Sequence, residues 1–74
     1  MLPMQSIQRQ LGGRIRKLRM GRGWSQEKFA EITGFHRTYV GAVERGEKNL
    51  TISTLLTIAE TFDITIAALF RGIA

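Results

Sequence analysis

The chain has 74 residues, no cysteine, one histidine and a net charge of +5 at pH 7. This length corresponds to one domain with a small core. The absence of cysteine excludes disulfides and thiolate metal sites, and one histidine without clustered carboxylates does not make a zinc site. No apolar run could span a membrane, and the first ten residues lack the core of a signal peptide. We therefore expect a soluble, cytoplasmic protein without a metal or cofactor.

The positive charge is concentrated in the first part of the chain. Residues 1–45 contain nine Lys or Arg against three Glu, whereas residues 46–74 contain two against three acidic residues. Such an asymmetry favours a polyanion as the partner. A basic face that is simply solvated is the alternative that charge alone leaves open.

The first predicted element is a helix over residues 6–20. Residues 1–5 are expected to form a flexible arm, with Pro3 blocking an earlier start and Ser6 capping the helix. One apolar stripe of helical period supports it, made of Ile7, Leu11, Ile15 and Leu18. Gly12 and Gly13 lie inside this helix at a cost of about 1 kcal/mol each relative to alanine. Either another helix packs closely there, or the helix begins later.

Two short helices joined by a tight turn are predicted over residues 25–46. Ser25 is a good N-cap, and Gly34 can adopt the left-handed conformation that ends a helix. His36 caps the next helix and Gly46 stops it. This order is the helix-turn-helix plan, in which the first turn of the second helix meets base edges in the major groove. That turn carries Arg37, Thr38 and Tyr39.

Two further helices are predicted in the last third of the chain. The first follows Thr51, is strongly apolar and ends at Asp63, and the second covers residues 66–70 after Thr65. Four successive helices thus share one start pattern, in which a cap follows one apolar residue and a second apolar residue lies five positions after the first. This agreement predicts an all-α fold with five helices in a single domain over residues 1–74.

The run from Leu11 to Phe70 resembles the lambda-repressor/Cro type of helix-turn-helix domain. The shared markers are SQEKFA, RTYV followed by ERG, and IAxxF. The stretch FHRTYVGAVERGEKNLT is particularly similar to controller proteins of restriction–modification systems, which are small homodimeric transcription factors that bind palindromes upstream of their own operon. The resemblance implies a sequence-specific transcriptional regulator that binds a palindromic operator in double-stranded DNA as a homodimer.

Four residues are candidates for base readout. Arg37 can bind O6 and N7 of guanine in fork geometry, and Thr38 can touch a thymine methyl or a base-edge acceptor. Tyr39 can contact phosphate, sugar or base, and the resemblance places Ala42 toward the groove. Each of these three has an alternative role. Arg37 could contact a phosphate, Thr38 could help the cap, and Tyr39 could pack on the domain. Because few long polar side chains project from this helix, DNA shape would supply much of the preference.

Further residues are candidates for phosphate contact and for structural support. The resemblance assigns Gln26 to a backbone phosphate, aided by a helix N-terminus. It also implies a buried ion pair between Arg19 and Glu44. The loop after the third helix offers phosphate contacts or solvated polar groups at Arg45, Lys48 and Asn49.

The end of the chain has more apolar residues than one small core needs. We predict an isologous homodimer through this region, with recognition helices about 34 Å apart on the DNA. The interface residues would be Phe62, Ile64, Ile66, Ala67, Phe70 and Ile73. Alternatives are an antitoxin-like regulator and a protein-interaction module that has lost DNA binding. No acid/base pair, nucleophile set or nucleotide-binding loop is recognisable, so we expect neither an enzyme nor a small-molecule ligand.

Overall fold

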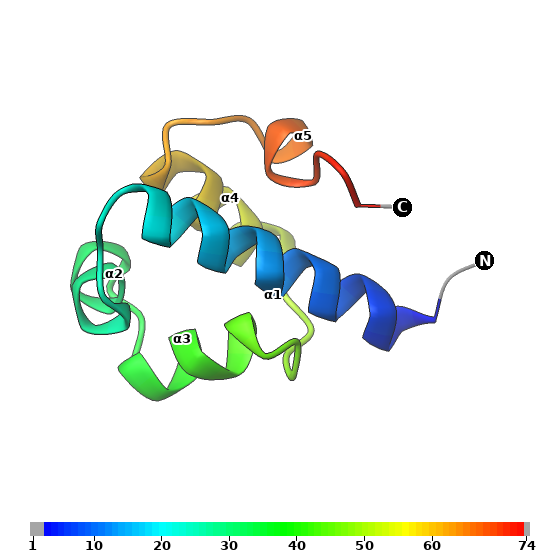
Figure 1. The fold of residues 1–74 in the computed structure, drawn as a ribbon, viewed down its shortest axis with the longest axis horizontal. Coiled ribbons are helices and arrows are strands. Elements are labelled where there is room, and N and C mark those ends of the chain that lie inside the picture. The colour runs from blue at the N-terminus through cyan, green and yellow to red at the C-terminus, as the bar shows by residue number, and fades with distance from the viewer. Residues whose placement is uncertain (1–2, 74) are drawn as a thin grey trace.

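The computed structural model describes residues 3–73, and those residues form five helices and no strand. α1 runs through the middle of the molecule, with α3 on one side and α4 and α5 on the other (Figure 1). The predicted all-α, five-helix fold is confirmed. None of the described helices is long and apolar enough to cross a membrane. The helix bounds are α1 Met4–Gly21, α2 Gln26–Thr33, α3 Arg37–Glu44, α4 Ile52–Thr61 and α5 Ile66–Leu69.

A side chain caps the N-terminus of each of the last four helices, as the shared start pattern predicts. Each cap accepts a hydrogen bond from an amide of the first turn, which would otherwise have no partner within the helix. The capping residues are Ser25, His36, Thr51 and Thr65, the last bonded by the amide of Ala68 at 3.0 Å. At the other end, Gly34 closes α2 with φ of 80°.

The start of α1 differs from the prediction. The helix begins at Met4 after Pro3 as N-cap, and not at Ser6. Proline suits this place, because it lacks only an amide hydrogen that would have no acceptor in the helix. The Ser6 amide already donates to the Pro3 carbonyl at 3.0 Å, so Met4 and Gln5 are helical and do not belong to an arm. The remainder of the predicted arm, residues 1–2, lies outside the described residues.

Gly12 is the point at which α1 touches α3. A Cβ atom built on Gly12 would lie 2.4 Å from the carbonyl oxygen of Val43 and 2.7 Å from that of Glu44. A Cβ on Gly13 would meet nothing within 4 Å. Close helix packing is therefore the reason for the glycine at position 12, and the alternative of a later helix start is excluded.

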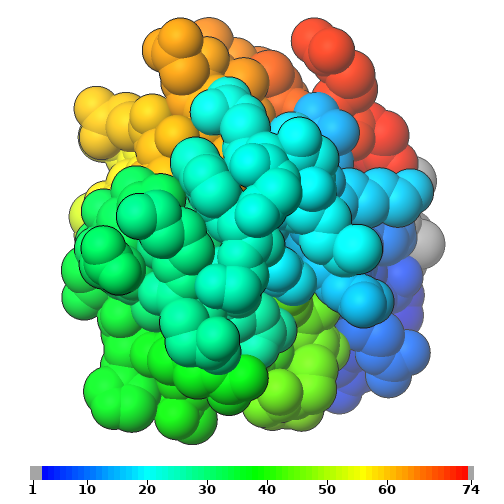
Figure 2. Space-filling model, turned by 60° about the vertical axis from the view of Figure 1, so that its left-hand side comes forward, coloured from blue at the N-terminus to red at the C-terminus, as the bar shows by residue number. Residues whose placement is uncertain are grey.

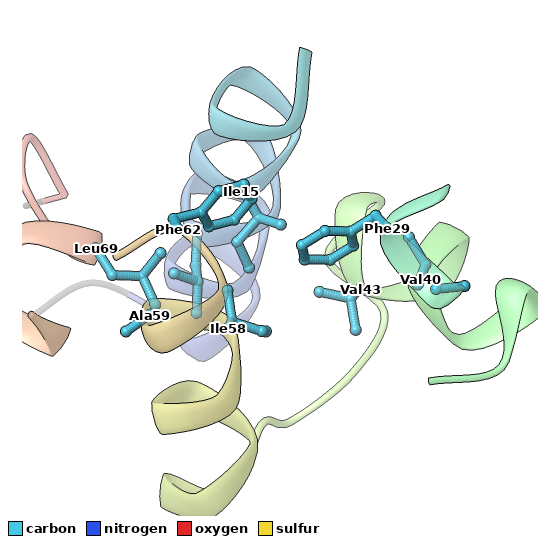
Figure 3. Close-up of a cluster of buried hydrophobic side chains, with 10 residues drawn as sticks. Ile15, Phe29, Val40, Val43, Ile58, Ala59, Phe62 and Leu69 are labelled. Atoms are coloured by element: carbon cyan, nitrogen blue, oxygen red, sulfur yellow. The ribbon is translucent and has the colours of Figure 1, made fainter. Parts of the chain in front are cut away.

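The core is a continuous apolar cluster to which all five helices contribute (Figure 3). Phe29 and Phe62 stack with ring centroids 5.2 Å apart, and Trp24 stacks on Phe62 at 5.7 Å. Phe62 is only 1% exposed. The prediction that Phe62 belongs to a dimer interface is therefore wrong, because this chain's own core covers its ring.

Candidate nucleic-acid interface

The turn between α2 and α3 places the first turn of α3 at the surface (Figure 1). Val40 and Val43 hold α3 on the core, while Arg37 and Thr38 are exposed. α2 and α3 form one continuous surface in the space-filling view, where α3 lies along the lower edge (Figure 2). On this surface is a shallow hollow of about 640 Å³, lined by His36, Thr38, Tyr39, Ala42, Arg45, Glu47 and Lys48.

Arg37 forms an ion pair with Glu27 in the first turn of α2. The Arg37 Nε lies 2.5 Å from a Glu27 carboxylate oxygen, and more than half of each side chain is exposed. Such an exposed pair contributes only about 0–1 kcal/mol to stability. Glu27 has no place among the residues predicted from the sequence, because ten positions separate it from Arg37 and no local pattern connects them. The pair is weak enough for a stronger acceptor to replace it.

The other three candidates for base readout line the hollow at different depths. Thr38 is exposed, and Tyr39 is half-buried with its ring edge-on to Phe35 at 5.4 Å between centroids. Ala42 is only 6% exposed and contributes little surface of its own. Its small side chain leaves the hollow open between Thr38 and the loop after α3.

Arg19 and Glu44 form the ion pair that the resemblance implies. The guanidinium is bidentate, with Nε 2.7 Å from one oxygen of Glu44 and Nη2 3.0 Å from the other. The remaining Nη1 donates to the Trp24 carbonyl at 2.7 Å. The hydrogen bond to Glu44 raises the pKa of Arg19 above its ordinary value. Because the Glu44 side chain is only 3% exposed, removing one partner of this pair would leave the other buried without compensation.

Gln26 joins this network from the first position of α2. Its Nε2 donates to the Glu44 carboxylate at 3.1 Å. Gly41 lies close to the Arg45 and Gln26 side chains. A Cβ on Gly41 would come within 3.0 Å of the Arg45 guanidinium and 3.8 Å of the Gln26 amide oxygen. The glycine thus makes room for two polar side chains on the outer face of α3.

The loop after α3 contributes a second set of polar groups. Arg45 is bidentate to Glu47 at 2.9 and 3.2 Å, and this hydrogen bonding lowers the pKa of Glu47. Asn49 accepts a hydrogen bond of 2.6 Å from Gln8, which ties the loop to α1. Lys48 has no hydrogen bond or ion pair with any residue from 3 to 73, so its charge is available to a ligand.

The apolar surface extends further than the sequence predicts. Ala67 is exposed, whereas the other remaining interface candidates, Ile64, Ile66, Phe70 and Ile73, are half-buried against the core. Among residues 3–73 the most exposed large apolar side chain is Ile52 on α4, at 78%, and Leu56 lies one turn further on at 48%. We call these two residues the outer face of α4. Their spacing of four, outside the core stripe of that helix, is the sequence signal that could have identified them.

An apolar groove of about 160 Å³ opens between the start of α1 and the α4–α5 region. Its apolar lining consists of Met4, Ile7, Leu11, Leu50, Leu55 and Phe70. Met4 is 60% exposed.

Known proteins match both the sequence and the fold. The helix-turn-helix family model matches residues 15–69. Control protein C.SmaI from Serratia marcescens is 44% identical over 59 residues, which are 80% of this chain and 70% of that protein. The crystal structure of the restriction-modification controller protein C.AhdI from Aeromonas hydrophila has 42% identity and a TM-score of 0.79, covering 84% of this chain and 94% of that one.

A third match describes a complex with DNA. It is the restriction-modification controller protein C.Esp1396I, crystallised as a tetramer with its natural 35 base-pair operator. It has 28% identity and a TM-score of 0.79, over 90% of this chain and 88% of that one. The two solved structures share the fold over 84% and 90% of this chain. The chain therefore belongs to the helix-turn-helix family, as a DNA-binding transcriptional regulator similar to restriction–modification controller proteins.

Proposed function

We propose that this protein binds a palindromic operator as a homodimer and controls transcription from it, as a restriction–modification controller protein does. The carrying observation is the exposed first turn of α3, where Arg37 and Thr38 project beside the hollow. The operator complex of C.Esp1396I, which has the same fold, supports this proposal. The operator would lie upstream of the protein's own operon, in keeping with the resemblance.

In this proposal Arg37 reads a guanine and Thr38 and Tyr39 read its neighbours. Guanine offers two acceptors to an arginine fork, whereas the Glu27 carboxylate binds the Arg37 Nε from the side. The guanidinium then exchanges the exposed Glu27 carboxylate for the guanine when DNA binds. Ala42 acts through its small size, because it lets a base edge enter the hollow.

Phosphate contacts would flank the base contacts on both sides. Gln26 lies at the N-terminus of α2, where free amides and the helix dipole favour an anion. Lys48, Arg45 and Asn49 lie on the loop beyond the other end of α3. These contacts release counterions, so the affinity should fall steeply as salt rises.

We place the dimer interface on the outer face of α4 together with the exposed surface of residues 64–70. Ile52 and Leu56 add the apolar area that the half-buried residues of this region cannot supply alone. An isologous contact through this surface would relate two copies by a two-fold axis, which a palindromic operator requires.

The DNA proposal is tested by selecting random duplexes with the purified protein at near-physiological salt and sequencing those retained. We expect a two-fold-symmetric motif. Arg37→Ala should relax the preference at one position in each half-site, by about 1–3 kcal/mol of discrimination. Gln26→Ala should weaken binding to all sequences alike. Arg16→Ala is the matched control for Arg37→Ala, because it removes the same charge from another helix. Selection of no motif would contradict operator binding. An unchanged motif with Arg37→Ala would contradict base readout by Arg37.

The dimer is tested by sedimentation at micromolar protein concentration. The variant Ile52→Lys/Leu56→Lys should sediment as a monomer, since the two side chains are 78% and 48% exposed in the single chain and neither belongs to its core. The control Met20→Lys/Ile32→Lys introduces the same charges at exposed apolar positions elsewhere and should leave the dimer intact. A dimeric Ile52→Lys/Leu56→Lys variant would exclude the outer face of α4 from the interface.

A further inference from the structure

A second hollow lies between α1 and the turn that follows α5. Its volume is about 370 Å³, and it is lined by Arg9, Gln10, Gly13, Arg14, Lys17, Arg71, Gly72 and Ile73. We call it the basic groove, because four of these residues are cationic and none is acidic. It is separate from the hollow on α3, with which it shares no residue.

The four cations of the basic groove have no acidic partner among residues 3–73. Each ion pair in that range uses other basic residues, namely Arg19, Lys28, Arg37 and Arg45. Like charges gathered around one hollow repel one another, and low-dielectric walls strengthen the field inside it. An anion bound in the groove would attract all four side chains and offset their mutual repulsion.

Arg14 is held in place at the edge of the groove. Its Nη2 donates to the carbonyl of Ala68 at 3.1 Å, which joins α1 to α5. Its Nε is buried and has no hydrogen-bond partner among the residues that the structure describes. An unsatisfied buried donor is uncommon in a folded protein. The guanidinium is thus oriented in advance, and the protein does not fully satisfy it.

We propose that the basic groove binds a phosphate group, held chiefly by Arg14, Lys17 and Arg71. Phosphate fits better than a single carboxylate, because it carries up to two charges and offers more acceptor oxygens to several cations. Two sources share this chemistry: a phosphorylated small molecule and the backbone of DNA beyond the operator. The groove is within the size range of small-ligand sites. A small-molecule source would depart from the expectation, drawn from the sequence, that no such ligand binds.

The position of the basic groove is also compatible with DNA as the source of the phosphate. Arg9 belongs to the groove and also packs against the turn after α3, where a Cβ on Gly46 would lie 2.7 Å from the Arg9 Cα. The basic groove therefore begins next to the loop that carries Lys48. Flanking duplex that curves toward α1 would bring its phosphates to this face.

The site is tested on the free protein by titrating inorganic pyrophosphate and following backbone amide resonances. Gly13 and Gly72 line the groove, and their amide resonances should shift in a saturable manner. Lys17→Gln/Arg71→Gln should weaken this binding at least tenfold, and neither side chain has an ion pair with any residue from 3 to 73 whose loss would disturb the fold. The control Arg16→Gln/Lys28→Gln removes the same charge outside the groove and should bind as the wild type does. Equal weakening in both variants, or shifts without saturation, would overturn the proposal.

A second measurement identifies the source of the phosphate. Affinities are compared for the selected duplex and for the same duplex extended by ten base pairs at each end. A DNA source requires that the extension tighten binding by wild type and by Arg16→Gln/Lys28→Gln but not by Lys17→Gln/Arg71→Gln. A small-molecule source requires no effect of the extension, with pyrophosphate still bound in the DNA complex. Because the first titration contains no DNA, failure of the operator proposal would leave its outcome unchanged.

Discussion

The contact between α1 and α3 makes a sharp prediction about two adjacent glycines. Gly12→Ala places a methyl group 2.4 Å from one backbone carbonyl oxygen and 2.7 Å from the next. Because the obstacle is backbone, no side chain can rotate away, and α3 must move. Overpacking of this kind costs about 1–3 kcal/mol, and we expect the upper end here. The better helix propensity of alanine returns about 1 kcal/mol, so the net loss is about 2 kcal/mol.

Gly13→Ala is the matched control, since its methyl group meets nothing within 4 Å. It should stabilise the protein by up to about 1 kcal/mol, because it gains helix propensity without a clash. The two variants should therefore differ by about 3 kcal/mol, which corresponds to at least about 12 °C in Tm for a domain of this size. Thermal and urea unfolding followed by circular dichroism measure the difference. Equal stabilities for the two alanine variants would refute the close approach of α1 and α3.

Three further predictions concern single contacts. Glu44→Ala leaves Arg19 charged and buried, so it should lower the unfolding free energy by about 3–5 kcal/mol in urea titrations; a loss below 1 kcal/mol would contradict the pair's burial. Arg45→Ala should raise the pKa of Glu47 toward its ordinary value in a carboxyl NMR titration. In the intact protein this depressed pKa favours folding above the unfolded-state pKa, and the contribution disappears as the pH falls through the folded-state pKa. Asp63→Gly should raise Tm slightly, because position 63 has φ of 56° and glycine adopts it without strain; a lower Tm would show that the aspartate side chain stabilises the turn.

Local signals explain why most of the fold could be predicted. An apolar residue followed by a capping hydroxyl acts within about one helical turn, so the starts of α2, α4 and α5 depend on few distant residues. The start of α1 was misplaced because two local signals competed there. Ser6 had the chemistry of a cap, but Pro3 allowed the helix to begin earlier.

Tertiary contacts explain what could not be predicted. Helical periodicity shows that Phe62 faces either the core or a partner chain, but it does not say which of the two covers the ring. In the structure the rings of Trp24 and Phe29 cover it. The pair between Arg37 and Glu27 depends on the angle between α2 and α3, which no spacing along the chain encodes. The basic groove forms only when α1 and the end of the chain meet in space.

The two ends of α3 are held very differently, and this has a consequence for dynamics. Glu44 closes the helix with a buried, bidentate bond to α1, whereas Arg37 at the other end has one exposed partner. Fast motion should therefore increase along α3 toward its N-terminus, which NMR order parameters would report as a gradient. Side chains that reorient at this end can adapt to different half-sites, and the DNA complex loses their freedom as an entropic cost.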